Sequence, residues 1–96
     1  MTIFAILMPI QQPKLVEAIK TEFPNDHLSI TETQWLVSSF ETIVNVTAKL
    51  GIYDEKSPSA PSNGNAIIFA VSSYHGRAPV LVWDWIKAKL EANTNG

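Results

Sequence analysis

Cysteine is absent from this 96-residue sequence, and charged side chains make up only 17% of it. Without thiols the chain can form neither disulfides nor cysteine-ligated zinc and iron–sulfur sites, and nothing indicates an oxidising compartment. Seven basic and nine acidic residues leave a formal charge of −2, which provides no positive field to attract nucleic acid. Nucleic acid is therefore an unexpected partner, and the cytoplasm is the expected location.

The apolar residues that open the chain are too few for the roughly 20 that a membrane-spanning helix needs. No basic stretch precedes them and no small-residue cleavage site follows, so we expect a buried strand there, with no signal peptide and no membrane association. The 46% hydrophobic content is typical of a folded chain. We predict a single domain over residues 1–91 and a frayed polar tail over 92–96.

Four segments have the patterns of β-strands. Uninterrupted apolar runs at residues 3–8 and 66–71 predict strands buried on both faces of a sheet. Residues 28–31 and 34–38 predict two more strands with a tight turn near Glu32 and Thr33, although one long bent strand is an alternative. Residues 53–65, rich in proline, serine and asparagine, predict a flexible loop.

Three segments have the patterns of helices. The first opens at Pro13 and stops at Pro24, with Leu15, Val16, Ile19 and Phe23 on its apolar face. In the second, Ser38 and Glu41 match a capping box, which predicts a start at Ser38 and an end at Gly51. The apolar face of this second helix would hold Phe40, Ile43, Val46 and Leu50.

The order of these elements predicts an α+β fold. We expect a ferredoxin-like split βαβ sandwich (βαββαβ) with an additional C-terminal helix, or a sheet with one strand fewer. The two internal helices of that arrangement cover one face of the sheet, yet the two long apolar runs have large side chains on both faces. The last helix, from Pro79 to about Leu90, is therefore expected to cover the other face.

This last helix has two apolar patches. Val82, Trp83, Ile86 and Leu90 share one face, and a second patch, displaced by over a quarter turn, holds Leu81, Trp85 and Ala88. A helix with two apolar faces is usually covered on both. The second patch therefore predicts an interface, and a homodimer follows as a hypothesis.

The segment at residues 72–77 is the densest polar cluster, between a predicted central strand and a helix start. Tyr74, His75, Gly76 and Arg77 there are candidate ligands for a phosphate or carboxylate, since backbone N–H groups, an imidazole and a guanidinium can surround an anion. The alternative is that Gly76 makes a turn, Arg77 bonds a nearby carbonyl or acid, and Tyr74 packs. Neither a P-loop nor G-x-G-x-x-G is present.

Catalytic and metal-binding patterns are scarce. The two histidines are far apart without H-x-x-x-H spacing, and no G-x-S-x-G elbow occurs, so we expect no catalytic residue, no metal and no cofactor. Asp26 next to His27 favours a turn over a general base. Trp35 is expected in the core, with an interface anchor or base-stacking role as the alternative. An enzyme is the less expected class.

Together with the element order, the stretch Thr33-Gln34-Trp35-Leu36-Val37 resembles small ferredoxin-fold proteins related to the compact subunit of the CRISPR spacer-acquisition complex. The resemblance covers roughly the first 75 residues and implies a homodimer that joins sheets. Some of those proteins are metal-dependent nucleases with an aspartate just after the first strand. Here Met8, Pro9 and Ile10 stand in that place, so the nuclease role does not carry over.

Two functional hypotheses follow. The first is a non-catalytic protein–protein interaction module, homodimeric through the second helix patch or a sheet edge, acting as an inhibitor or accessory subunit. The second is a binder of a nucleotide or nucleic-acid phosphate at residues 74–77.

Overall fold

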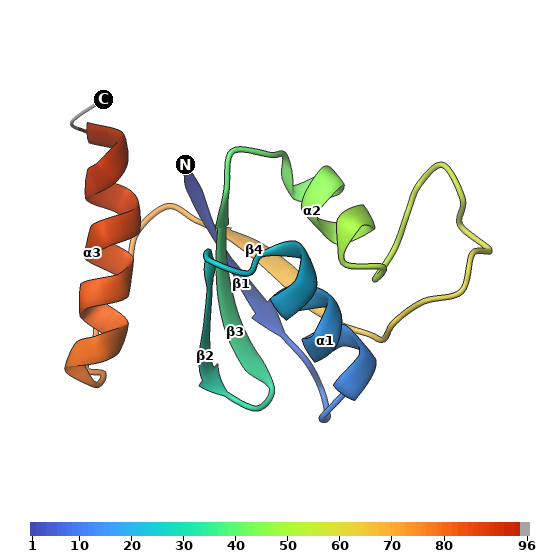
Figure 1. The fold of residues 1–96 in the computed structure, drawn as a ribbon, viewed down its shortest axis with the longest axis horizontal. Coiled ribbons are helices and arrows are strands. Elements are labelled where there is room, and N and C mark those ends of the chain that lie inside the picture. The colour runs from blue at the N-terminus through green and yellow to red at the C-terminus, as the bar shows by residue number, and fades with distance from the viewer. Residues whose placement is uncertain (95–96) are drawn as a thin grey trace.

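Three layers make up the structure, a computed structural model that describes residues 1–94 and the side chains as far as Leu90. The described residues form an α+β fold with one four-stranded antiparallel sheet and three helices. The elements are β1 (Thr2–Leu7), α1 (Pro13–Glu22), β2 (His27–Thr31), β3 (Gln34–Ser39), α2 (Ile43–Lys49), β4 (Ile67–Val71) and α3 (Val80–Thr94). Helices α1 and α2 lie on one side of the sheet and α3 lies on the other (Figure 1).

The strand order is β2-β3-β1-β4, and every neighbouring pair is antiparallel. Strands β1 and β3 are therefore central, and the tight turn between β2 and β3 at residues 32–33 is confirmed. The prediction that residues 66–71 are buried on both faces is wrong. β4 is an edge strand, and Ile67 and Phe69 are exposed. An apolar run has the same sequence pattern whether neighbours within the chain cover both its faces or not.

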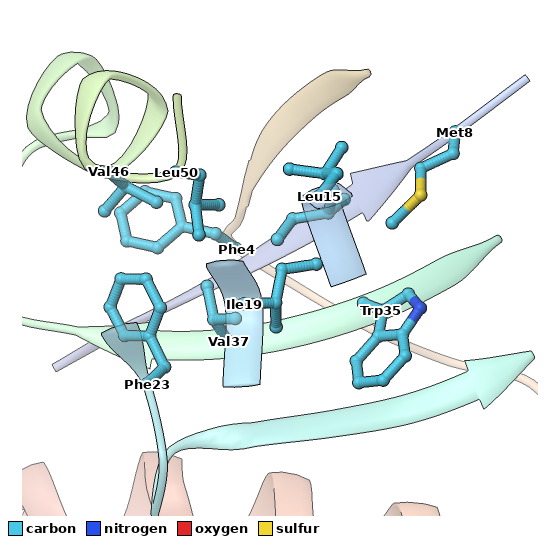
Figure 2. Close-up of a cluster of buried hydrophobic side chains, with 10 residues drawn as sticks. Phe4, Met8, Leu15, Ile19, Phe23, Trp35, Val37, Val46 and Leu50 are labelled. Carbon is cyan, nitrogen blue, oxygen red and sulfur yellow. The ribbon is translucent and has the colours of Figure 1, made fainter. Parts of the chain in front are cut away.

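The first core fills the space between the sheet and helices α1 and α2. Alternate residues of β1 face this layer, as expected for a strand whose side chains alternate between faces. Figure 2 shows the side chains converging from β1, α1, β3 and α2: Phe4, Ile6, Met8, Leu15, Ile19, Phe23, Trp35, Val37, Val46 and Leu50. The expected apolar face of the first helix is confirmed, since Leu15 and Ile19 are fully buried.

The second core lies between the opposite face of the sheet and α3. Ile3 of β1 and Leu36 of β3 pack there against Val82 and Ile86. The last helix thus covers the face that α1 and α2 leave open, as the sequence predicted. Lys89 links α3 to the segment between α1 and β2, because its Nζ lies 2.6 Å from Asp26 Oδ1 and 3.2 Å from the Asn25 carbonyl oxygen.

The predicted start of the second helix is wrong. Ser38 lies inside β3 with its side chain buried, and Phe40 is 79% exposed. The N-cap of α2 is Thr42, whose hydroxyl accepts a hydrogen bond from the Asn45 N–H. Because serine and threonine recur at residues 38, 39 and 42, the capping pattern fitted the sequence in more than one place. Val46 and Leu50 are buried as expected.

The end of α2 and the loop after it are fixed by local hydrogen bonds. Gly51 has φ +73°, the left-handed conformation expected at a helix end. Asn63, near the far end of the loop, donates from Nδ2 to the Leu50 carbonyl at 2.9 Å and from its backbone N–H to the Gly51 carbonyl at 2.7 Å. No helix or strand forms over the intervening residues 53–62.

Helix α3 continues to Thr94, into the segment expected as a tail, and the last two residues of that segment lie outside the described residues. No helix in residues 1–94 has the length and apolar character needed to span a membrane.

Candidate functional sites

The predicted anion-binding residues lie on the connection between β4 and α3. Tyr74 packs on Trp83, with ring centroids 5.6 Å apart, while His75 and Arg77 are exposed. The side chains of His75 and Arg77 form no hydrogen bond or ion pair with any described residue. Of the alternative interpretation, the packing of Tyr74 matches the structure and the bond from Arg77 to a carbonyl or acid does not, while Gly76, with φ +145°, lies at a bend of the chain. The strand before this segment is at an edge, whereas the sequence predicted a central one.

The predicted helix interface is divided between exposed and packed residues. Leu81 and Ala88 are exposed, but Trp85 is partly buried against the second core, and Lys89 Nζ lies 5.8 Å from its ring centroid. Trp83 also packs on that core. Both indole side chains therefore pack on the same core, although a helical wheel of Cα positions places them on different faces. The predicted patch of Leu81, Trp85 and Ala88 is therefore not one free face.

A different apolar surface is exposed on the sheet itself. Leu7, Ile67 and Phe69, here called the edge patch, are 41%, 62% and 51% exposed. Leu7 pairs with Ile67 across the β1–β4 ladder, and alternation places all three residues on the face that α3 covers elsewhere. Leu7 and Ile67 also line a hollow of about 360 Å³. The edge patch lies beside the outer edge of β4, with which no strand of residues 1–94 pairs.

Sequence reasoning did not find the edge patch because strand order decides it. Ile67 and Phe69 belong to a run that predicted full burial, and only the position of β4 at the sheet edge leaves them uncovered. One geometric argument could have predicted an exposed apolar area: a single helix is narrower than the face of a four-stranded sheet and leaves part of that face uncovered.

A groove of about 570 Å³ lies between α1 and β2, on the face of the sheet that does not contact α3. Trp35 lines it, with the indole N–H donating to the Glu32 carbonyl at 3.1 Å. The His27 ring lies 5.8 Å from the Trp35 ring, and Lys20 Nζ lies 6.0 Å from it. Trp35 is in the core, as expected, and also borders this groove.

Residues 1–90 contain no group of three or more histidine, aspartate or glutamate side chains positioned to hold a metal ion. Comparison of the chain with protein-family models, with curated proteins and with solved structures found no match.

Proposed function

We propose that this chain is a small non-catalytic protein–protein interaction module that forms a homodimer through the outer edge of β4. The observation that carries the proposal is the edge patch of Leu7, Ile67 and Phe69 beside an unpaired strand edge. Such a dimer would act as an inhibitor or accessory subunit, with its remaining surface free for another protein.

We also propose that the arrangement is ferredoxin-like. The antiparallel order β2-β3-β1-β4 supports this, because β1 and β2 each flank β3 while β3 and β4 each flank β1. Each of α1 and α2 then connects two strands that have one strand between them, and both helices pack on the same face. Helix α3 is the addition to that arrangement.

The composition of β4 favours association through its edge. Natural edge strands usually have a lysine, a proline or an inward charge that discourages pairing with another chain. The five residues of β4, Ile-Ile-Phe-Ala-Val, include none of these. An exposed apolar edge without such protection is stabilised when another strand covers it.

A second copy of the chain fits this edge by symmetry. If two β4 strands pair antiparallel about a two-fold axis at Phe69, each Phe69 faces its counterpart and each Ile67 faces a Val71. All of these side chains are apolar and lie on the same face of the sheet. The paired strands would join the two sheets into one and bring the two edge patches side by side on one face.

Light scattering on three forms of the protein at matched concentration tests the proposal. Wild type is expected to have the mass of a dimer and Phe69→Lys that of a folded monomer, because two like charges directly opposite each other across the new ladder oppose association. Leu81→Lys, a change at the exposed leucine of α3, is expected to remain a dimer. A monomeric wild type would refute the dimer, and a monomeric Leu81→Lys with a dimeric Phe69→Lys would move the interface to α3.

A second candidate function, binding of a nucleotide or other phosphate at residues 74–77, has the unpartnered side chains of His75 and Arg77 in its favour. Inorganic phosphate and a mononucleotide should then raise the thermal unfolding temperature of wild type. Arg77→Ala should abolish that rise and leave the unliganded unfolding temperature unchanged. An equal rise in both proteins, or none in wild type, would exclude this site.

A further inference from the structure

The groove between α1 and β2 is independent of the edge patch and of the segment at residues 74–77. Its volume, about 570 Å³, falls within the range of roughly 300 to 1,000 Å³ typical of small-molecule sites. Helix α1 forms one wall through Pro13 and Val16, and β2 forms the other through His27 and Ser29. Both walls belong to regular elements, so the groove is a formed feature of the fold.

The part of the groove between its two ends is apolar and has a fixed shape. Trp35 is only 6% exposed, and it lies at one end of the first core, away from Phe23 and Val46 (Figure 2). The protein itself satisfies its indole N–H, through the Glu32 carbonyl. Trp35 therefore contributes only a small aromatic area, and Pro13 and Val16 supply the rest of the apolar lining, which suits an apolar or aromatic group.

One end of the groove is cationic. Lys20 lies over the Trp35 ring, and the ion pairs of the described residues, Lys49 with Glu41 and Lys89 with Asp26, do not involve it. His27 also lies near the Trp35 ring, and its Nδ1 lies 2.6 Å from the Phe23 carbonyl oxygen. A carbonyl only accepts, so Nδ1 carries a hydrogen and donates it, and Nε2 of the neutral ring is then an acceptor for a ligand N–H.

The other end of the groove is acidic and rich in amides. Glu32, in the turn between β2 and β3, accepts a hydrogen bond from the Gln11 side-chain amide, and both residues line the groove. Gln11 lies just before α1, whereas Lys20 is near the end of that helix. At about 1.5 Å of rise per residue, the helix from Pro13 to Lys20 covers about 10 Å of the length of the groove.

We propose that this groove binds a small zwitterion of short-peptide size with an apolar or aromatic middle. Its carboxylate would lie at Lys20, its amine at Glu32, and its middle against Pro13 and Val16, beside Trp35. An extended peptide of two or three residues spans about 7 to 11 Å, which matches the length of α1 along the groove. A ligand with a single charge would leave one end of the groove without a complementary group.

The test uses the tripeptide Gly-Phe-Gly with two blocked forms, one N-acetylated and one C-terminally amidated. Binding to the full chain is followed by NMR through the indole N–H signal of Trp35, with those of Trp83 and Trp85 as internal controls. The zwitterion should bind about two- to fivefold more tightly than either blocked form, as expected from exposed ion pairs. Only the Trp35 signal should shift.

Three variants assign each charge of the tripeptide to a residue. Lys20→Gln should bind the amidated and free-acid forms equally, and Glu32→Gln should bind the acetylated and free-amine forms equally. Lys14→Gln, on α1 but outside the groove, should bind like wild type. An unmoved Trp35 signal at millimolar peptide, equal binding of all three forms to wild type, or the same loss in Lys14→Gln would each overturn the proposal.

Discussion

Gly51 occupies a position where any side chain meets two obstacles. Its φ of +73° is costly for residues with a Cβ atom, and a Cβ there would collide with the side chain of Asn63. Gly51→Ala is expected to lower the free energy of unfolding by about 2 kcal/mol, measured by urea denaturation. The double variant with Asn63→Ala should lose less than the sum of the single losses. Strict additivity would show that the collision plays no part.

Ser38 and Ser39 are neighbours with opposite hydrogen-bonding situations. The buried Ser38 hydroxyl bonds no group in the described part of the chain, whereas Ser39 Oγ accepts from the Glu41 N–H at 3.0 Å. Ser38→Ala removes an unpaired buried hydroxyl and should raise the free energy of unfolding by up to about 1 kcal/mol, while Ser39→Ala should lower it by about 1 kcal/mol. Denaturation curves that rank the two variants the other way would contradict this assignment.

At the scale of elements, the contact between α3 and the sheet is testable through two aliphatic residues of that helix. Ile86 is 8% exposed in the second core, and Leu81 is 70% exposed. Ile86→Ala should cost about 2 to 4 kcal/mol, because it leaves a cavity over the sheet, and Leu81→Ala should cost under about 0.5 kcal/mol. Equal costs in thermal or chemical denaturation would mean that α3 does not pack on the sheet through Ile86.

Element by element, hydrophobic periodicity accounts for most of what the sequence predicted. It identified the seven segments that form β1 to β4 and α1 to α3, and it placed α3 on the open face of the sheet. The start of α2 was misplaced because Ser38 and Thr42 compete as caps, and local sequence does not decide between them.

The candidate sites were harder to predict, because each depends on contacts between distant residues. The edge patch exists only since β4 is at the edge, and the groove exists only since α1 lies beside β2. The sequence analysis considered His27 and Trp35 as single residues. Nothing in the sequence predicted that Lys20 and His27 would both lie near the Trp35 ring. The predicted helix patch was divided because Trp85 packs on the second core while Leu81 and Ala88 are exposed.

For the whole molecule, amide hydrogen exchange should follow the order of the strands. The central strands β1 and β3 pair on both sides and should exchange slowest, while β4 pairs only with β1. If the chain dimerises through β4, protection of the amides at Ile67 to Val71 should increase with protein concentration, and protection of β2 should not. Protection of β4 that is independent of concentration would contradict association through that strand.

The long connection from Gly51 to Ala66 divides the fold into two unequal parts, with only turns and bends between them. Everything before it builds three strands and two helices, and everything after it supplies β4, which pairs with β1, and α3, which covers Ile3 and Leu36. A break in the exposed middle of this connection, near Ser57, would therefore separate the chain without cutting any helix or strand. The two fragments would be complementary in structure, because only their association restores the fourth strand and the second core together.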